Sequence, residues 1–368
     1  MSGNSIGKSF VLTCFGESHG RCVGVVVDGC PHGIQLTATD IQAEVNKRRP
    51  ISDKISTSRK EEDKVEILSG VFNNYTTGAP ICMIVWNKEV DSSAYDELRW
   101  KPRPGHADLV ALLRYNDFND YRGGGRFSGR ITVAFVMAGA VAKKVLERIG
   151  VEVLAYTLEV AGIGLNSTPT IEDIRNNVYR NAMRCTNPAV AREMEIAVLN
   201  AREEGDSVGG IIECQVLNFP GGVGDPIFDS LDAELARILF DIPAVKGVEF
   251  GAGFGASRLK GSENNDQYSL KEGNIVTLKN NAGGILGGLS NGMPIVVRVG
   301  FKPTPSISKM QKTVDLKDRI EVPIEIRGRH DACIVPRAVP VVESAVEIVL
   351  VDHLLRLCLV KRAFDENE

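Results

Sequence analysis

Histidine is scarce in this chain, with five residues in 368. The eight cysteines include no C-x-x-C pair, which excludes zinc-ribbon and thioredoxin-like sites. Several cysteines lie inside apolar runs, so we expect buried free thiols. The N-terminal residues contain no apolar signal region, and together with the free thiols this pattern predicts a cytoplasmic protein.

The chain also lacks an excess of charge of one sign. It has 43 Lys and Arg residues and 47 Asp and Glu residues, which give a net charge of −4, so no general attraction for nucleic acid is expected.

The chain also lacks an uninterrupted apolar span. Charged or polar residues break the longest apolar stretch, 338–360, which predicts a buried helix rather than a membrane span. The residues that interrupt this stretch are Glu343, Glu347, Asp352, His353 and Arg356.

No Pro- or Ser-rich linker divides the chain, so residues 1–368 are expected to form one large α+β domain. Apolar periodicity and capping residues predict alternating strands and helices, in two halves of similar style but unrelated sequence. The expected strands are 9–14, 22–27, 65–68, 81–86, 151–163, 208–216 and 245–250. The expected helices are 37–47, 108–115, 131–149, 171–183, 188–204 and 230–240. Small residues in 131–149 would allow close helix packing.

Two histidines lie in glycine-flanked polar blocks, Gly16-Glu-Ser-His-Gly20 and Arg103-Pro-Gly-His-Ala-Asp108. The first block joins two predicted strands and is therefore a loop. An imidazole titrates near neutral pH, so His19 and His106 are candidate acid–base groups. Ser18, Glu17 or Asp108 could orient the rings. The lone His32 and His353 are instead predicted to be structural.

A glycine loop rich in arginine, Arg122-Gly-Gly-Gly-Arg-Phe-Ser-Gly-Arg130, directly precedes the predicted helix 131–149. The N-terminus of a helix after such a loop favours negative charge. A solvated charged face is the alternative, but the glycines favour a loop whose guanidinium forks (Arg122, Arg126 and Arg130) converge on an oxyanion. The sequence thus predicts a highly anionic substrate.

Three further polar segments suit phosphate contact. The first is 51–64, an aperiodic surface loop with Lys54, Arg59 and Lys60. The second is the rigid Lys302-Pro-Thr-Pro-Ser306, which is also compatible with a simple turn. The third is Gly328-Arg-His-Asp331, where Asp331 is either a site residue or a plain surface carboxylate.

The segment Gly251–Ala256 fits the relaxed dinucleotide pattern G-x-G-x-x-[GA] after a predicted strand. The pattern's mechanism requires a helix N-terminus next, but the residues from 257 to 266 are polar and aperiodic. A nicotinamide site is therefore disfavoured here. Tight turns would equally explain this segment and the second glycine cluster, 281–288.

Eight blocks stand out in order along the chain. They are Phe15-Gly-Glu-Ser-His-Gly20, Arg48-Arg-Pro50, Arg103–Asp108, Tyr121–Arg126 with Ser128 and Arg130, Lys246-Gly-Val-Glu249, Ala282–Gly288, Lys302-Pro-Thr304 and Gly328–Asp331. Together these collinear blocks closely resemble those of chorismate synthase. The resemblance implies a lyase that eliminates phosphate from 5-enolpyruvylshikimate-3-phosphate with reduced FMN, in the last step of the shikimate pathway. It also implies a β-α-α-β sandwich with internal pseudo-twofold symmetry, assembled as a homotetramer.

The resemblance assigns roles to individual residues. His19 would protonate the departing phosphate, His106 would lie by the flavin, and Ser18 and Asp331 would form a relay. Substrate would be held by Arg48, Lys54, Arg103 and Arg130. Flavin would be held by Arg126, Phe127, Ser128, Ala244, Gly287, Lys302, Pro303, Thr304, Pro305, Ser306 and Arg329.

The chain departs from the family pattern at a few positions. Phe127 and Ile131 stand where the family commonly has a hydroxyl and a carboxylate, Pro243 replaces an Asn, and Lys54 replaces an Arg. Two other functions stay open. The glycine clusters and the implied flavin are compatible with a flavin-dependent oxidoreductase, and Phe127 and Ile131 are compatible with a phosphometabolite-binding homologue with impaired catalysis. The compact length and charged end of the chain predict that NADPH acts only as an indirect reductant, through a separate flavin reductase.

Overall fold

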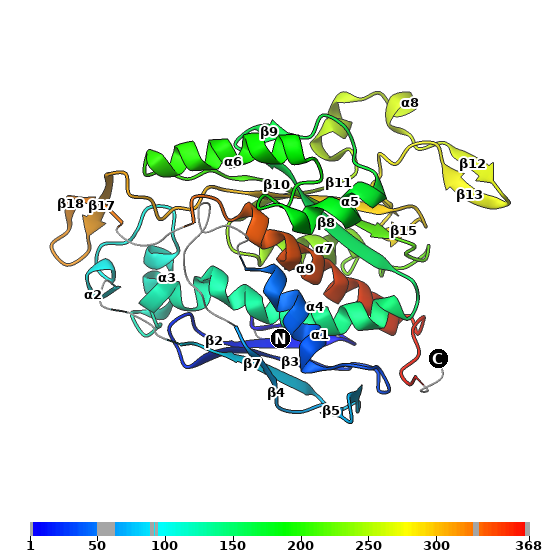
Figure 1. Ribbon diagram of the computed structural model, residues 1–368, viewed down its shortest axis with the longest axis horizontal. Coiled ribbons are helices and arrows are strands. Elements are labelled where there is room, and N and C mark those ends of the chain that lie inside the picture. Colours follow the sequence, from blue (N-terminus) through cyan, green and yellow to red (C-terminus); the bar gives the residue numbers. More distant parts are fainter. Residues whose placement is uncertain (1–2, 50–62, 89–91, 93–94, 327–330, 365–368) are drawn as a thin grey trace.

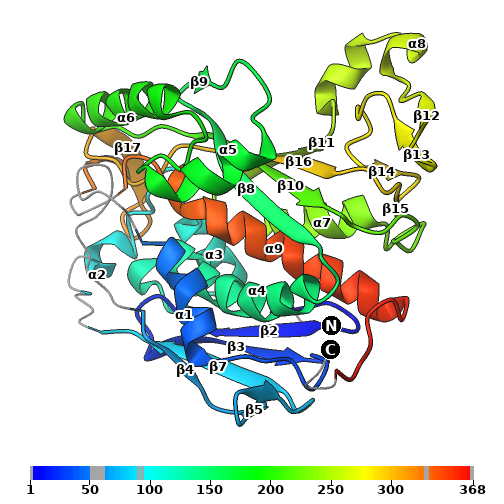
Figure 2. The same cartoon turned by 45° about the vertical axis from the view of Figure 1, so that its right-hand side comes forward.

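Two antiparallel five-stranded sheets enclose a double layer of helices (Figures 1 and 2). This computed structural model describes residues 3–49, 63–88, 92, 95–326 and 331–364. The first sheet has the strand order β1 (Ser5–Ile6), β2 (Val11–Gly16), β3 (Cys22–Asp28), β7 (Ile81–Trp86), β4 (Val65–Ile67). The second has the order β11 (Val245–Phe250), β16 (Ile295–Phe301), β10 (Gly210–Leu217), β8 (Glu152–Val160), β9 (Ile163–Gly164).

Four helices form the two inner layers. Helices α1 (Ala38–Lys47) and α4 (Thr132–Glu147) lie against the first sheet, and α7 (Leu231–Phe240) and α9 (Val335–Arg356) lie against the second. The predicted α+β class and the β-α-α-β sandwich are confirmed, each half consisting of one sheet and two helices. One hydrophobic core runs through both halves and includes buried side chains from both sheets and all four helices.

The remaining elements lie around this sandwich. Helix α6 (Pro188–Glu203) contacts β8 and β9 of the second sheet, and α5 (Ile171–Asn177) contacts β8. On the side of the histidine blocks lie α2 (Tyr95–Leu98) and α3 (Asp108–Tyr115). The smaller elements are α8 (Gly261–Asn264) and the hairpins β5–β6 (71–76), β12–β13 (268–277), β14–β15 (285–290) and β17–β18 (311–324).

Most predicted elements are present, with two kinds of difference. The strand expected over 151–163 ends at Val160, because Ala161 and Gly162 adopt positive φ values of 54° and 80° and reverse the chain into β9. Strands β1 and β16 and the four hairpins β5–β6, β12–β13, β14–β15 and β17–β18 were not predicted. The hairpins expose large apolar side chains and have no face that is consistently buried. Their sequences therefore lack the alternation of apolar and polar residues by which a strand is recognised.

Helices α4 and α9 approach each other closely at Gly139, as the small residues predicted. A Cβ atom built on Gly139 would lie 2.3 Å from the Cβ of Ser344 on α9. Glycine is therefore the residue that permits this helix–helix distance. The contact fixes how the two halves of the sandwich meet.

Helix α9 is buried along almost its whole length, including its acidic residues, as expected of an interior helix. The carboxylate of Glu343 accepts hydrogen bonds from Ala155 N at 2.9 Å and from the Tyr179 hydroxyl at 2.6 Å. Burial nevertheless raises the pKa of Glu343. No helix among the described residues is long and apolar enough to cross a membrane.

The C-terminal end of α9 anchors the beginning of the first sheet. Oδ1 of Asp352 accepts the backbone N–H groups of Lys8, Ser9 and Phe10 at 2.8, 2.6 and 2.8 Å. The neighbouring His353 is 1% exposed. Burial, with a smaller contribution from Arg356, lowers the pKa of His353 from 6.5 to about 4.

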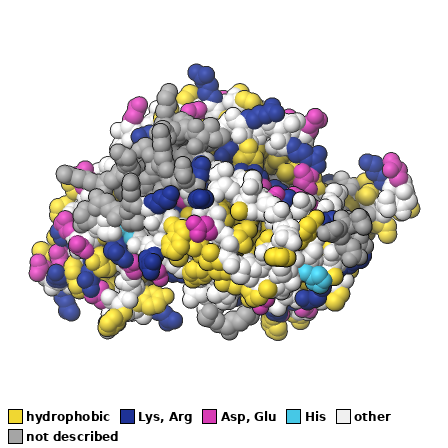
Figure 3. All heavy atoms as spheres, turned by 60° about the horizontal axis from the view of Figure 1, so that its bottom comes forward, with side chains coloured by type: hydrophobic (Ala, Val, Ile, Leu, Met, Phe, Trp, Pro, Cys, Tyr) yellow, Lys and Arg dark blue, Asp and Glu magenta, His cyan; other side chains and the backbone are white. Residues whose placement is uncertain are grey.

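No helix of the described residues covers the outer face of the first sheet (Figure 1). Viewed from that side, the molecule shows apolar side chains among the charged ones (Figure 3). Near this face Leu68, Phe72 and Trp86 are 59%, 70% and 42% exposed. The sheet thus has one side packed on the helices and one partly apolar side open to contact.

Substitution Gly139→Ala tests the close approach of α4 and α9. Alanine favours a helix over glycine by about 1 kcal/mol, but its methyl group would overlap Ser344. We expect a net loss of roughly 1–3 kcal/mol in the free energy of unfolding, measured in urea. Gly255→Ala is the control, because no atom lies within 4 Å of its Cβ position. Equal stability of the two variants would contradict the close contact.

His353 predicts a pH dependence of stability. Its folded-state pKa lies below the unfolded value, so the unfolded chain binds the proton first as the pH falls. The contribution of neutral His353 to the free energy of unfolding is fully present above pH 7. This contribution is lost as the pH falls from about 6.5 to about 4, and the loss is roughly 1–3 kcal/mol. Urea unfolding of the wild type and of His353→Gln should therefore give a stability difference that changes across this interval. A constant difference would show that the fold does not lower the pKa of His353.

Candidate active site

The first histidine block is a loop, residues 17–21, between β2 and β3 that packs on the glycine loop. Ser18 N donates to Gly125 O at 3.2 Å. Gly123 has a φ of +61°, and a Cβ on it would lie 2.3 Å from His19 Cδ2 and 2.8 Å from Ser18 Oγ. Only glycine satisfies both the backbone conformation and this contact. The two glycine-containing blocks thus lie face to face.

The side chain of His19 is nearly buried, and His19 as a whole is 6% exposed. Its Nδ1 lies 2.9 Å from Ser92 Oγ, and its ring meets that of Tyr95 edge-on at 5.1 Å. The sequence suggested Ser18, Glu17 or Asp108 as the orienting group for such a ring. Asp108 bonds Arg103, and the Ser92 hydroxyl lies within hydrogen-bond distance of Nδ1. The Nε2 side of the ring faces Gly123.

The second histidine block packs against the segment 302–306. His106 Nε2 lies 2.6 Å from Oγ of Ser306, a side chain that is 5% exposed. Lys302 Nζ donates to Gly105 O. Gly105 has a φ of +74°, and its Cβ position is 3.0 Å from Pro305. Residues 200 positions apart thereby meet in one place.

Arg103 and Asp108 form a bidentate pair within the second block. Arg103 Nε and Nη2 donate to the two carboxylate oxygens of Asp108, each at 2.8 Å. Burial would raise the pKa of Asp108, but the hydrogen bonds and the charge of Arg103 hold it below its usual value. The Arg103 guanidinium also lies over the ring of Tyr95 at 5.7 Å. Because Tyr95 also contacts His19, this ring joins the two histidine blocks.

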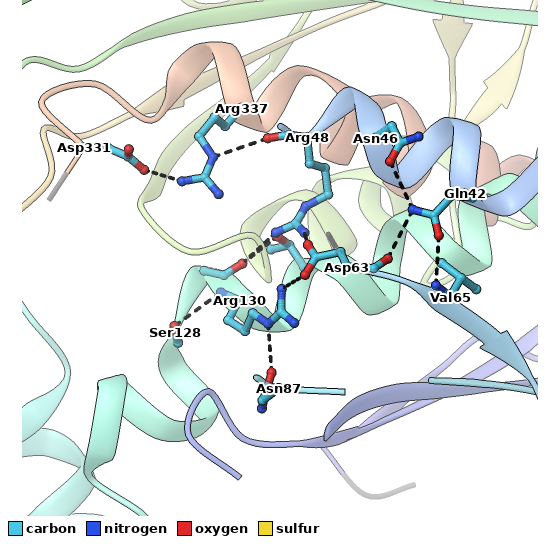
Figure 4. A network of polar contacts seen from close by, with 12 residues as sticks. Gln42, Asn46, Arg48, Asp63, Val65, Asn87, Ser128, Arg130, Asp331 and Arg337 are labelled. Carbon is cyan, nitrogen blue, oxygen red and sulfur yellow. Dashed lines mark hydrogen bonds and ion pairs between the residues drawn. The ribbon is translucent and has the colours of Figure 1, made fainter. Parts of the chain in front are cut away.

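Arg48 and Arg130 are brought together by the carboxylate of Asp63 (Figure 4). Arg130 Nη1 bonds Asp63 Oδ1, and Arg48 Nη1 lies 3.6 Å from Oδ2. Arg48 Nη2 also donates to Thr132 Oγ1 at 3.0 Å. All three charged side chains are nearly buried, with exposures of 8% to 12%. Two guanidinium groups thus lie side by side at the start of α4.

The three arginines of the glycine loop do not converge in the described structure. Arg122 pairs with Asp120, and Arg126 donates to the carbonyls of Cys14 and Gly16 at the end of β2. Positive φ values at all three central glycines separate the forks. Ser128 Oγ accepts the N–H of Arg130 at 3.3 Å, and Phe127 is 43% exposed beside Tyr115.

The segments around Ala244 and Lys302 adjoin at the edge of the second sheet. Lys302 N donates to Ala244 O at 3.0 Å, and Ala244 adopts a positive φ of 76°. Burial and the charge of Lys246 lower the pKa of Lys302, which makes this corner suited to an anion. Thr304 Oγ1 is buried without a hydrogen-bond partner among the described residues.

Gly287 is not brought to this corner within the chain. It belongs to the β14–β15 turn, whose Gly288 O accepts the N–H of Leu231 at the first residue of α7. Ala244 follows the other end of that ten-residue helix, about 15 Å away along its axis. Lys54, Arg329 and His330, with the rest of 50–62 and 327–330, lie outside the described residues.

Asp331 lies at the entrance to α9, where Arg337 Nη1 donates to its Oδ2 at 2.5 Å (Figure 4). Arg337 Nε also donates to the backbone carbonyl of Arg48 at 3.4 Å. No hydrogen bond joins Asp331 to Ser18 within the described part of the chain. Among these residues there is also no group of three or more His, Cys, Asp or Glu side chains that could hold a metal ion.

Sequence reasoning missed four residues of this site: Asp63, Asn87, Ser92 and Tyr95. They lie in or beside stretches without periodicity or repeated motifs, so no pattern marked them. The one usable signal was position, because Asn87 directly follows the predicted strand 81–86.

The dinucleotide pattern Gly251–Ala256 leads into a 3-10 helix, Gly253–Arg258, and not into an α-helix. The strand–turn–helix that would hold a pyrophosphate is therefore not formed at this segment.

Comparison with known proteins gives a consistent result. The family profile described as chorismate synthase matches residues 10–355. A chorismate synthase of Dehalococcoides mccartyi is 54% identical over 363 residues, covering 99% of this chain and 100% of that protein. One of Korarchaeum cryptofilum is 52% identical over 356 residues, with 97% and 98% covered. A crystal structure of chorismate synthase is 27% identical and covers 96% of this chain and 93% of its own, with a TM-score of 0.75.

These matches span nearly the whole chain and agree with the order of its glycine, histidine and arginine blocks. The chain therefore belongs to the chorismate synthase family and is a carbon–oxygen lyase of the shikimate pathway.

Proposed function

We propose that the chain converts 5-enolpyruvylshikimate-3-phosphate into chorismate by a trans-1,4-elimination that uses reduced FMN. Phosphate leaves C3, a hydrogen leaves C6, and the ring gains a double bond. The observation that carries the proposal is the convergence of His19, Arg103 and the Arg48–Arg130 pair around one glycine loop. An anionic substrate with a leaving phosphate needs this combination of fixed cations and a proton donor.

The substrate has two carboxylates and one phosphate, and its proposed clamps are Arg48, Arg103, Arg130 and Lys54. Arg48 and Arg130 lie within reach of one carboxylate, that of Asp63, so their spacing suits a single anionic group. Arg103 is oriented by its bidentate pair with Asp108. Nearly buried guanidinium groups bind an anion more strongly than solvated ones, because less water screens the charges.

His19 is proposed to donate the proton that the departing phosphate takes up. Ser92 holds its Nδ1 and Tyr95 packs against its ring, which leaves the Nε2 side turned to the glycine loop. His106 is proposed to lie beside the cofactor, held there by Ser306. Ser18 and Asp331 are proposed to relay the proton released from C6, with Arg337 orienting Asp331.

The residues at the corner of Ala244 and Lys302 fit FMN. The lysine pair Lys246 and Lys302 suits its phosphate, and the buried Thr304 hydroxyl is a polar group that a ligand would satisfy. Bound reduced FMN would supply electron density that helps phosphate to leave. The proposed contacts are Arg126, Phe127, Ser128, Ala244, Lys302, Pro303, Thr304, Pro305, Ser306 and Arg329. Gly287, also a proposed contact, does not lie at this corner within one chain.

We further propose that NADPH reduces the flavin only indirectly, through a separate reductase. The 3-10 turn at Gly253–Arg258 supports this, because it offers no pyrophosphate-binding helix. A homotetramer is proposed to assemble through the outer face of the first sheet, near which Leu68, Phe72 and Trp86 are exposed.

Eight free cysteines support a reducing, cytoplasmic setting.

An anaerobic assay tests the function. Purified protein, 5-enolpyruvylshikimate-3-phosphate and dithionite-reduced FMN should give chorismate, detected by its ultraviolet absorbance. NADPH with oxidised FMN should give none until a flavin reductase is added. Folded protein that forms no chorismate with reduced FMN would refute the lyase proposal and favour an impaired homologue. Sustained turnover with NADPH alone as reductant, in the dark, would refute the indirect route.

Substitution of the two site histidines tests their roles. His19→Ala and His106→Ala should each lower turnover by roughly 10- to 10⁴-fold, the usual contribution of an acid–base group. Circular dichroism should show unchanged folding. His32→Ala is the matched control, because His32 is an exposed histidine remote from these loops, and its turnover should stay within about twofold of the wild type. Near-normal turnover of either site variant would remove that histidine from the mechanism.

A further inference from the structure

Asn87 is placed beneath the histidine loop by the first sheet. Strands β3 and β7 pair up to Cys22 and Trp86, and Asn87 N continues the ladder by donating to Arg21 O at 3.0 Å. This ladder restricts the backbone of Asn87, so its side chain is held next to the loop that carries Ser18 and His19.

The amide group of Asn87 contacts two separate parts of the site. Nδ2 donates to the carbonyls of Glu17 and Gly20, at 3.0 and 2.8 Å, which flank Ser18 and His19 in the chain. Oδ1 accepts a hydrogen bond from Arg130 Nε at 3.1 Å (Figure 4). One planar group thus holds both the histidine loop and a guanidinium of the arginine pair.

The chemistry of the partners fixes the orientation of this amide. Carbonyl oxygens only accept and a guanidinium only donates, so the NH₂ group must face the loop and the oxygen must face Arg130. Of the twenty side chains, Asn supplies this donor–acceptor pair at this length. Aspartate would keep the acceptor and lose both donors.

We propose that Asn87 is a positioning residue that sets the placement of the His19 loop relative to Arg130, and through Asp63 relative to Arg48. This inference rests on the proposed function for the roles of His19 and Arg130. A proton donor and an anion clamp must meet the same substrate, and a displacement of about 1 Å between them can cost on the order of 100-fold in rate. A residue that couples the two would affect turnover without touching the substrate.

Two substitutions separate the two contacts. Asn87→Asp keeps the acceptor for Arg130 but places negative charge against the carbonyls of Glu17 and Gly20, which loosens the histidine loop. Asn87→Leu has a similar shape and loses both contacts. For Asn87→Asp we expect kcat to fall roughly 10- to 100-fold with KM within about threefold of the wild type. For Asn87→Leu we expect a fall in kcat and a rise in KM.

A double-mutant cycle tests the coupling. If Asn87 acts partly through Arg130, Asn87→Leu should cost at least about fivefold less in kcat/KM when combined with Arg130→Ala than in the wild type. The matched controls are Asn281→Asp and Asn281→Leu. Asn281 Nδ2 also donates to two backbone carbonyls, those of Glu263 and Asn264, but outside the site. These controls should stay within about twofold of wild-type kinetics.

The experiment is the steady-state assay with reduced FMN, alongside thermal unfolding of each variant. A wild type that forms no chorismate counts against the proposed function and not against this inference. With an active wild type, unchanged kinetics of both Asn87 variants, or fully additive effects in the cycle, would overturn it. So would Asn87→Asp with a raised KM and a normal kcat, which would assign Asn87 to Arg130 alone. If Asn87→Leu does not fold, Asn87→Asp decides.

Discussion

The close contact of α4 with α9 is the constraint on which the arrangement of this molecule depends. Gly139 brings α4 against Ser344 of α9 in the middle of the sandwich. The N-terminus of α4 follows the glycine loop and Arg130, and the N-terminus of α9 follows Asp331 and carries Arg337. Because Arg337 bonds the backbone carbonyl of Arg48, the helix contact also sets the distance between these site groups.

Buried carboxylates on α9 add specificity to this packing. A carboxylate without partners is costly to bury, so Glu343 tolerates only a register in which Ala155 N and the Tyr179 hydroxyl reach it. Asp352 also restricts the alignment, near the C-terminal end of the helix, because three backbone N–H groups of residues 8–10 converge on one of its oxygens. Polar contacts thereby select one alignment of helix and sheets, while the apolar core supplies most of the stabilisation.

The active-site loops are held in a different way, by several short polar contacts at once. Ordering one residue of a loop costs about 1–2 kcal/mol of conformational entropy, whereas a typical hydrogen bond returns a net 0.5–1.5 kcal/mol. A single contact is therefore not enough to fix His19. The loop is held by Asn87, by the Gly125 carbonyl, and by the packing of Tyr95 and Gly123. Gly123 contributes by removing a side chain that would push the imidazole away.

The sequence by itself determined the elements and the chemical character of the site. Apolar periodicity marked the strands of the first sheet and the long buried helices, because burial against a layer repeats every second residue in a strand and about every 3.6 in a helix. Glycine-flanked histidines and arginines marked His19, His106 and the glycine loop, and their order along the chain identified the family.

Only the tertiary structure decided which polar groups meet. Asp63 with Arg48 and Arg130, His106 with Ser306, and Asn87 with the histidine loop join residues from 15 to 200 positions apart, and such pairs leave no periodic trace in a sequence. The fold also separated the three arginines of the glycine loop that the sequence suggested would converge, because the left-handed turns at Gly123–Gly125 direct each side chain to a different neighbour. Local patterns report burial and backbone conformation, whereas side-chain partners depend on how distant layers pack.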